Sequence, residues 1–541
     1  MKTKKSGVSF GVCAAVLPVL FAVLALVACS AYLEKEFEWN DDGDNSGGRS
    51  GSKITTSNFY AVDLTTNTYY SLKADLLAEG NYCKIWVEQA SKQYFTAAGA
   101  KKLAAEYDSN IYGKMLACFD IGKVNVDDNT TVGNILAAAD WLTDGDGKLS
   151  ILMLDIRDGY TPQSGSYTAG YFSPANFYKD GGFYRSNQKD MVYMDTYPAK
   201  PGSTESCQTL AHELQHLMNF ITSFVVRVDG NKVNLMDTWV DEGLSSAAEY
   251  LYLGSQVEGR CAWFASDPMG TIATGNNFFV WGNRNGTSIL DDYSTGYLFF
   301  QWLRIQAGST GIYKKIISSQ HPDYRAVTDA AKEKISWFGG GTWDTLFESW
   351  LAANYINAGS EAYGYLNDSR LKQLHAKSAP SGTHYLDLLP GEAVYSKTAT
   401  ATTTASYRNT DSGTHIKYVG LDKNGSVDAN NTYADGALLT YNSNTDNQYG
   451  SVNDLVALKE KGYLTGVAEQ TVTQSGARLA RSSSIGGTKE EPVRIDARDM
   501  LARNGAGGAL GIPGRAYVLN NAMLNNAMLK NATFSIGAGD E

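Results

Sequence analysis

Apolar and polar residues alternate along the part of the chain that follows residue 53. Between Lys53 and about Gln89 the alternation includes Tyr60, Val62 and the run from Tyr82 to Val87. A period of two is typical of β-strands, so this segment is predicted to form short strands. Residues 96–118 have helical spacing instead. The apolar positions on one side of this predicted helix are Ala97, Leu103, Tyr107, Ile111 and Met115.

A mixed pattern of strands and helices continues up to residue 200. The predicted elements are a short helix near 137–141, a buried strand over 149–156, and further strands at 167–172 and 191–194. Pro198 and Pro201 then end this pattern, and Ser203 or Thr204 can cap the helix that follows. From there to about residue 375 the apolar spacing is predominantly helical.

The composition changes after Pro380, where Thr, Ser, Gly, Asn and Tyr dominate and short strands and turns are predicted. The sequence therefore predicts an α+β fold: a β-rich half, then a helical half, then a separate C-terminal β-rich region. The 33 Tyr and 54 Gly of the chain agree with a turn-rich, β-rich architecture. The formal net charge of −11 argues against a nucleic-acid partner, because a phosphate backbone requires Lys and Arg to neutralise it.

The first residues of the chain have the features of an export signal. Three lysines lie within the first five residues, and an apolar run extends from Val8 to Val27. The run ends in Leu26-Val27-Ala28-Cys29, which resembles a bacterial lipobox. That resemblance implies cleavage before Cys29 and a diacylglycerol on its thiol, which would tether the exported protein to a membrane. The alternative is an uncleaved signal anchor.

The segment after Cys29 bears on the destination of the protein. Ser30 follows the cysteine, and no Asp retention signal is present, so an outer-membrane location is expected in a diderm bacterium. Residues 30–53 are rich in Asp, Asn, Gly and Ser and are predicted to form a solvated tether. Four further cysteines leave disulfides and free buried thiols equally open. They are Cys83, Cys118, Cys207 and Cys261.

A histidine pair stands out in the helix predicted after Pro201. Residues 212–216 read His-Glu-Leu-Gln-His, so His212 and His216 project from one helical face and can share a metal ion. Two of the chain's 6 histidines lie in this one motif. Imidazole nitrogen suits Zn²⁺, and two histidines with one carboxylate leave a fourth position for water. Glu213 is placed to act as a general base.

A second segment supplies candidates for the third ligand. Residues 239–251 read WVDEGLSSAAEYL, and Glu242 and Glu249 lie two helical turns apart on one face. A carboxylate that faces inward from so apolar a helix is costly unless it has a partner. Zinc for one glutamate and a ligand histidine for the other would remove that cost.

Together the two segments resemble the gluzincin clan of zinc peptidases, in which HExxH is followed on a later helix by a glutamate ligand. In the aminopeptidase branch the second segment reads WLNEGFASYxE, against WVDEGLSSAAE here, so Asp241 replaces the usual Asn. The resemblance implies that His212, His216 and Glu242 bind zinc and that Glu249 supports a ligand histidine. The long interval between His216 and Glu242 resembles the hyicolysin-like secreted peptidases instead.

A weaker match lies at residues 293–303, YSTGYLFFQWL, which resembles the YEKGxxLLxYL segment of gluzincin aminopeptidases. The resemblance implies that Tyr293 donates a hydrogen bond to the oxyanion. Tyr297 is the alternative, although the register favours it as a packing residue. The aminopeptidase segment GxMEN, whose glutamate holds a substrate's free amino terminus, is not found upstream of His212. Its absence favours an endopeptidase.

The function predicted from these features is zinc-dependent hydrolysis of protein substrates at the cell surface or in the periplasm. The alternative is a catalytically silent zinc-binding surface lipoprotein, an adhesin or a binding module, and the presence of Glu213 favours catalysis over it. Asp144 and Asp146 could form a calcium loop, but a tight turn before a strand is the favoured interpretation.

The predicted divisions follow from these segments. They are a signal peptide at 1–28, the lipidated cysteine and tether at 29–53, a β-rich part of the catalytic unit at 54–200, a helical zinc-binding part at 201–378 and a β-rich accessory region at 379–541. A cleft between the two catalytic parts is expected to hold the zinc site, as in the thermolysin-like fold of the gluzincins. The accessory region is expected to bind substrate, cell wall or a host surface.

Overall fold

The computed structural model describes residues 54–445, with gaps, and two short strands beyond them. The gaps of three residues or more are 127–129, 133–144, 164–166, 182–184, 280–288, 379–389, 399–415, 423–426 and 429–435. The predicted signal peptide, Cys29 and the tether lie outside the described residues, as does the helix predicted near 137–141. All described residues belong to one compact unit, Lys53–Glu541.

A seven-stranded sheet forms the first half, in the order β1-β2-β3-β6-β8-β7-β16. Its strands are β1 (Thr56–Asp63), β2 (Thr68–Glu79), β3 (Cys83–Glu88), β6 (Leu149–Leu154), β7 (Gly170–Phe172), β8 (Met191–Asp195) and β16 (Tyr517–Leu519). Strands β3, β6 and β8 are parallel, and the other pairings are antiparallel. The predicted strands at 53–89, 149–156, 167–172 and 191–194 are therefore confirmed, with shorter bounds for the second and third.

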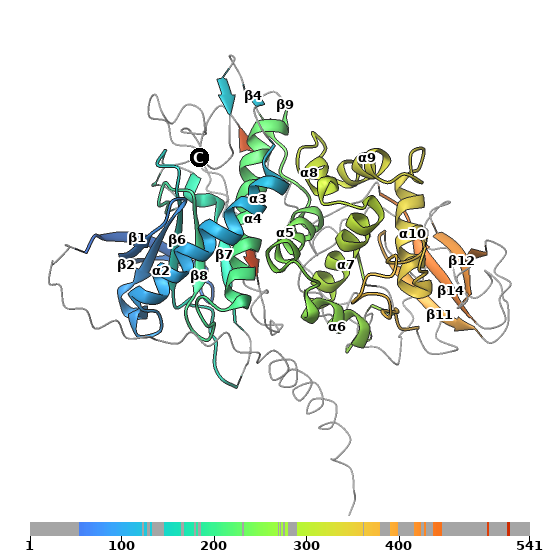
Figure 1. Ribbon diagram of the computed structural model, residues 1–541, viewed down its shortest axis with the longest axis horizontal. Helices are drawn as coiled ribbons and strands as arrows, with labels where there is room; N and C mark the ends of the chain where they lie inside the picture. The colour runs from blue at the N-terminus through green and yellow to red at the C-terminus, as the bar shows by residue number, and fades with distance from the viewer. Residues whose placement is uncertain are drawn as a thin grey trace, which may run out of the picture. The chain divides into compact units, whose positions relative to one another are not determined.

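Both faces of the central strands are buried, which explains their continuous apolar runs. On one face Ile151 and Met153 of β6 pack into the main core with helices α2, α3 and α4 (Figure 1). On the other face Leu152 and Leu154 join a smaller cluster with Trp86. Strand β6 thus separates two apolar layers, and its alternate side chains fill both.

The helix predicted over 96–118 is present but is interrupted by one wider turn. Helix α2 (Ala97–Glu106) leads through a π-helical turn (Tyr107–Ile111) into α3 (Tyr112–Phe119). Leu103, Tyr107, Ile111 and Met115 are buried as predicted. Ala97 is exposed, because it lies in the first turn before the helix reaches the sheet, and Ala100 is the first residue of α2 to be buried.

The helical half begins at α4, whose N-terminus is capped by Ser203. The Ser203 hydroxyl accepts a hydrogen bond of 3.2 Å from the Ser206 amide, so Ser203 rather than Thr204 is the cap. The helices of this half are α4 (Thr204–Val226), α5 (Thr238–Leu253), α6 (Glu258–Ser266), α7 (Ile289–Ala307), α8 (Gly311–Ile317), α9 (Tyr324–Lys334) and α10 (Trp343–Ile356). Helices α4 and α5 are buried along almost their whole length.

A three-stranded sheet and a two-stranded pair are the smallest β-structures among the described residues. The three-stranded sheet has the order β15-β10-β9, and the pair is β4-β5. Their bounds are β4 (Val124–Val126), β5 (Thr130–Val132), β9 (Val228–Asp229), β10 (Lys232–Val233) and β15 (Ile495–Asp496), and the short 3₁₀ turns are Gln89–Gln93 and Pro174–Phe177. The mixed α+β architecture predicted from the sequence is therefore confirmed.

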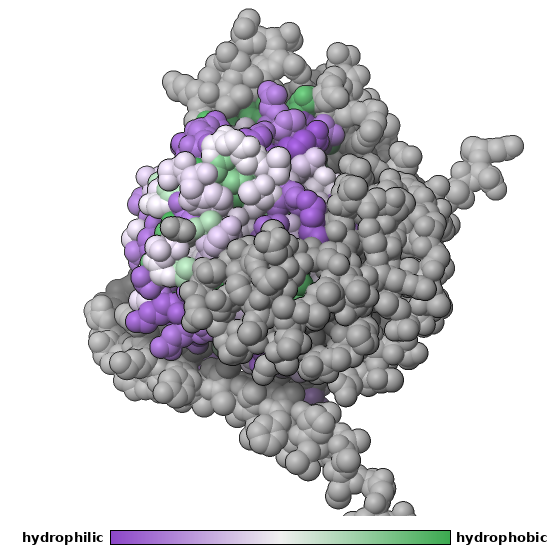
Figure 2. Space-filling view, turned by 90° about the vertical axis from the view of Figure 1, so that its right-hand side faces the viewer, coloured by the Kyte–Doolittle hydropathy of each residue, from purple (hydrophilic) through white to green (hydrophobic). Residues whose placement is uncertain are grey.

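A separate four-stranded antiparallel sheet lies in the predicted C-terminal region. Its order is β11-β14-β12-β13, with β11 (Ala393–Thr398), β12 (Ile416–Asp422), β13 (Val427–Asp428) and β14 (Gly436–Asn442). It packs on α10, where Lys417 forms an ion pair of 2.9 Å with Asp344 and the Tyr441 hydroxyl bonds Glu348. Figure 2 shows this end of the molecule, where the described surface is mostly hydrophilic or intermediate in hydropathy.

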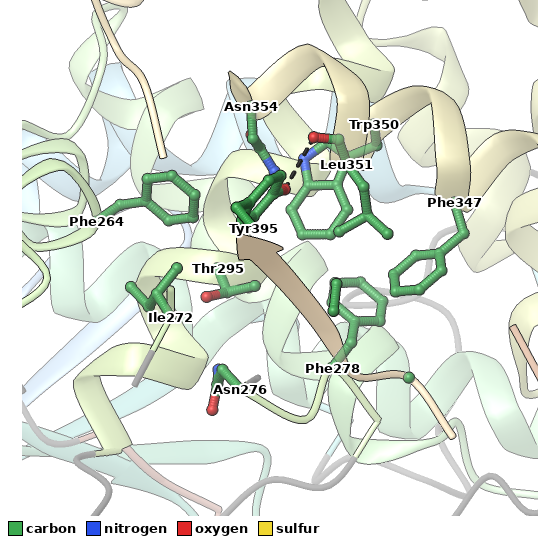
Figure 3. A pocket seen from close by; sticks show the side chains of 12 residues that line it. Phe264, Ile272, Asn276, Phe278, Thr295, Phe347, Trp350, Leu351, Asn354 and Tyr395 are labelled. Atoms are coloured by element: carbon green, nitrogen blue, oxygen red, sulfur yellow. Dashed lines mark hydrogen bonds between the residues drawn. The ribbon is translucent and has the colours of Figure 1, made fainter. Parts of the chain in front are cut away.

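A small cavity marks the joint between the helical half and this sheet (Figure 3). Its lining includes the aromatic side chains of Phe264, Phe278, Phe347 and Trp350. The Tyr395 hydroxyl closes one side by donating to the Leu351 carbonyl at 2.8 Å. The lining residues come from α6, α7, α10, β11, the segment 272–278 and Gly391, so the cavity is a feature of the packing at this joint.

The four cysteines within the described residues are free and buried. Burial raises the pKa of each thiol to about 12, so each stays protonated at neutral pH. Of the two possibilities that the sequence left open, the structure has free thiols in the core. Among the described residues, no helix is both long enough and apolar enough to cross a membrane.

A glycine sets the distance between α5 and α7. A Cβ added at Gly243 would lie 2.1 Å from the ring of Phe300. We expect Gly243→Ala to lower the free energy of unfolding by about 1–3 kcal/mol, because the buried ring must move. Urea denaturation followed by tryptophan fluorescence measures this change.

The matched control is Gly259→Ala in α6, where an added Cβ would meet no atom within 4 Å. This substitution should leave the chain as stable as the wild type or slightly more stable, since alanine favours a helix over glycine. Equal effects of the two substitutions would contradict close α5–α7 packing at Gly243.

Candidate metal centre

Helices α4 and α5 bring three buried side chains to one point. One ligand atom from each of His212, His216 and Glu242 lies within 4.8 Å of the other two. Glu242 Oε2 is 3.3 Å from His212 Nε2 and 3.5 Å from His216 Nε2. The two histidines lie one turn apart on α4, and Glu242 approaches them from the second turn of α5.

These contacts fit a cation better than they fit hydrogen bonds. The Nδ1 atoms of both histidines face carboxylates, at 3.0 Å from Glu249 and 3.0 Å from Asp241, and donate to them. In the neutral form that binds a metal, each imidazole then presents the lone pair of its Nε2 to the Glu242 oxygen, which also carries only lone pairs. Within the described residues, neither His212 Nε2 nor Glu242 Oε2 has a hydrogen-bond partner.

The donor set and its spacing suit zinc. Two nitrogens and one carboxylate oxygen are a common zinc ligand set, with bonds of about 2.0–2.2 Å. Tetrahedral bonds of that length place the ligand atoms roughly 3.3–3.6 Å apart, which matches the two contacts that Glu242 makes. A cation among these atoms would remove the repulsion between the lone pairs.

His212 is held in place by Glu249, which in turn contacts an arginine. The Glu249 carboxylate accepts from His212 and also from Arg260 Nη2 of α6, at 2.9 Å. Burial raises the pKa of Glu249, but Arg260 and His212 outweigh burial and hold it below its usual value. Glu249 therefore stays ionised and fixes the tautomer of His212.

His216 is held in place by Asp241, the residue that stands where the gluzincin aminopeptidases have Asn. Its Oδ2 accepts from His216 Nδ1, and its Oδ1 accepts from the Asn219 side chain. The Ser245 hydroxyl lies 3.1 Å from the same His216 nitrogen. Each histidine of the cluster thus has its own carboxylate behind it.

Glu213 lies beside the first histidine and is fully buried. Neither of its oxygens has a side-chain partner among the described residues. Burial raises its pKa to about 7, and Glu242 acts in the same direction, while His212, His216 and the Phe172 amide of β7 act against them. This carboxylate is therefore poised to take up and release a proton near neutral pH.

The two tyrosines considered from the sequence have different surroundings. The Tyr293 ring lies 6.2 Å from the His212 ring, and the Arg260 guanidinium lies 4.5 Å from the Tyr293 ring centroid. Burial and then Glu242 raise the pKa of Tyr293 well above its usual value, so it remains a donor. Tyr297 instead donates to Gln256 at 2.6 Å and accepts from the Val257 amide, as a packing residue does.

Sequence reasoning missed three residues near the centre: Arg260, Asn219 and Arg227. Arg260 and Arg227 come from outside both motifs, and a charged residue in a helix or at its end is ordinary on a solvated surface. Asn219 lies three residues after His216, and a polar residue at that place on a buried helix was a usable signal. The calcium alternative finds no support, because Asp146 pairs with Lys84, and Asp144 lies outside the described residues.

The comparisons with known proteins point to the same chemistry. No protein-family model matches the chain. The chain is similar to the neutral metalloprotease ShpI of Staphylococcus hyicus, with 29% identity over 294 residues. The chain resembles a staphylococcal neutral metalloprotease. The matched region is 53% of this chain and 60% of that protein, so the chain spans about three fifths of its relative. The resemblance drawn from the motifs is confirmed.

Removal of one ligand tests the centre. We expect the full chain to bind about one zinc ion and Glu242→Ala to weaken binding at least about a hundredfold, since two histidines alone hold zinc poorly. Competition with a chromophoric chelator measures the affinity. His375→Ala is the control, because His375 is exposed and its Nδ1 lies 2.8 Å from the Tyr355 carbonyl, with no contact to the three ligands among the described residues. Unchanged affinity in Glu242→Ala would exclude Glu242 as a ligand.

Proposed function

We propose that this protein is a zinc-dependent endopeptidase that hydrolyses protein substrates. The observation that carries the proposal is the convergence of His212, His216 and Glu242 next to the carboxylate of Glu213, which is buried and has no side-chain partner among the described residues. The similarity to a neutral metalloprotease supports the same reaction.

The side chains around the centre divide the chemistry among them. A bound zinc ion would act as a Lewis acid toward the scissile carbonyl and the attacking water. Glu213 takes a proton from that water and delivers it to the departing amine. Glu249 and Asp241 hold the two imidazoles in the tautomer that leaves each Nε2 free of a proton. Tyr293 donates its hydroxyl proton in a hydrogen bond to the oxyanion.

An endopeptidase is favoured over an aminopeptidase by the strand next to Glu213. Strand β7 and the residues after it read Gly-Tyr-Phe-Ser-Pro, from Gly170 to Pro174, and contain no carboxylate. An aminopeptidase needs a negative group there to bind the free amino terminus of its substrate. The lack of one leaves the site able to accept a chain that continues in both directions.

The proposal includes a location outside the cytoplasmic membrane. The lipobox-like sequence that ends at Cys29 supports a lipid anchor, and Ser30 supports transfer to the outer membrane or cell surface in a diderm. Protein substrates would then come from the envelope or the surroundings of the cell. Mass spectrometry of the membrane-bound protein tests this part, through the mass of a diacylglycerol on Cys29.

The general base provides the decisive test of activity. We expect Glu213→Gln to lower kcat/KM on quenched casein by about 10²–10⁴-fold, because the proton has no acceptor, while the zinc content stays the same. The wild type should lose activity with 1,10-phenanthroline. Glu333→Gln, at an exposed carboxylate, is the matched control. If wild type and variant both hold zinc and neither cleaves casein or a broad peptide library, the silent lipoprotein is the better assignment.

The tyrosine pair provides a second test. Tyr293→Phe should lower kcat about 10–10³-fold with little change in KM, because its hydrogen bond forms only in the transition state. Tyr297→Phe should keep kcat and lower the free energy of unfolding by about 1–2 kcal/mol, since it loses the bonds to Gln256 and the Val257 amide. Steady-state kinetics and urea unfolding measure the two effects. A kcat loss confined to Tyr297→Phe would reverse the assignment.

A further inference from the structure

Arg227 lies at the C-terminal end of α4 with 1% of its surface exposed. Its guanidinium folds back along the helix and donates to the Asn219 carbonyl at 3.1 Å and the Ser223 hydroxyl at 2.8 Å. It also donates to the Ile317 carbonyl at 2.7 Å, at the end of α8. Two helix C-termini thus surround it, and their partial negative charge favours a buried cation.

A line of hydrogen bonds leads from this arginine to the metal centre. Arg227 Nη2 donates to Asn219 Oδ1 at 2.7 Å. The other end of the same amide, Asn219 Nδ2, donates to Asp241 Oδ1, and Asp241 Oδ2 accepts from His216 Nδ1 at 3.0 Å. Arg227 therefore fixes the orientation of the Asn219 amide, and Asn219 fixes the carboxylate that holds His216.

The buried negative charge around the centre explains why the hydrogen bonds from Arg227 to Asp241 matter. Four buried carboxylates surround the two histidines: Glu213, Asp241, Glu242 and Glu249. Arg260 contacts Glu249 directly, but among the described residues no arginine or lysine forms an ion pair with Asp241. The charge of Arg227, one amide away, is the positive charge on that side. A neutral Asn in place of Asp241, as in the gluzincin aminopeptidases, would not require a positive charge nearby.

We propose that Arg227 is a positioning residue: through Asn219 it holds Asp241 against His216 and so sets the affinity of the metal centre. The proposal rests on the proposed function, because it assumes that His216 binds zinc. A residue that served only as a helix cap would stabilise α4 and α8 in the same way whatever stood at position 241. The two roles therefore differ in how far Arg227 depends on Asp241.

A double-mutant cycle on the full chain separates the roles. The readout is the zinc dissociation constant, measured by competition with a chromophoric chelator. Arg227→Met should weaken zinc binding about 10–100-fold, the range typical for residues behind a metal ligand. In the Asp241→Asn background the same replacement should change the constant less than about threefold. Equal changes in both backgrounds, or no change in either, would overturn the proposal.

Further variants keep the test decisive if Arg227→Met does not fold. Asn219→Ala removes the bridge and leaves the arginine, and it should weaken zinc binding only while Asp241 is present. Arg227→Lys keeps the charge but loses the paired donors, and it should restore part of the affinity that methionine loses. Arg304→Met is the control, since Arg304 packs on Tyr250 and Gln301 in the same helical half and contacts none of the three ligands.

Cobalt provides a spectroscopic check on the same variants. In the Co²⁺-substituted chain, Arg227→Met and Asn219→Ala should change the visible absorption in the same direction, because both release His216 from Asp241. If the visible absorption of the folded variants changed in opposite directions, or not at all, the hydrogen bonds from Arg227 through Asn219 and Asp241 would not position His216. If the wild type binds no zinc, the proposed function itself fails; if it binds zinc and the cycle shows no coupling, only the role of Arg227 fails.

Discussion

The packing of α4 on α5 determines the rest of the centre. Both helices are buried on nearly every side, yet their contact carries two histidines and several carboxylates instead of an apolar seam. Gly243, directly after Glu242, keeps α7 close to α5. Three donor atoms thereby converge within 4.8 Å in a protein interior, where lone pairs that face one another are unfavourable without a cation.

The negative charge of the buried carboxylates must also be balanced, and nearby arginines provide the positive charge. Arg260 reaches Glu249 from α6, and Arg227 reaches the Asp241 side from the end of α4. Burial lowers the pKa of Arg227 to about 9 and Asp241 acts against this, so the guanidinium stays protonated at neutral pH. Each histidine is thus backed by an anion, and each anion has a cation nearby, directly or through one amide.

The sequence predicted those features that depend on neighbours along the chain. Alternation predicted the strands, and the i,i+4 spacing of His212 and His216 predicted a shared metal within a single helix. Glu242 required the family resemblance, because its partner lies on another helix. Arg227 and Arg260 could not be predicted, since contacts between elements decide whether an arginine is solvated or buried. The exposure of Ala97 depends in the same way on where α2 meets the sheet.

Glu213 distinguishes an enzyme from a silent metal protein in physical terms. A fully buried carboxylate without a side-chain partner destabilises the fold, and its raised pKa reflects that cost. Glu249 and Asp241 avoid most of the cost through their histidines, but Glu213 does not. A protein that only held zinc would be more stable with an apolar residue at this position, beside an apolar strand. A group that transfers protons has to be free of a side-chain ion pair in the resting site, so the lack of a side-chain partner for Glu213 favours turnover.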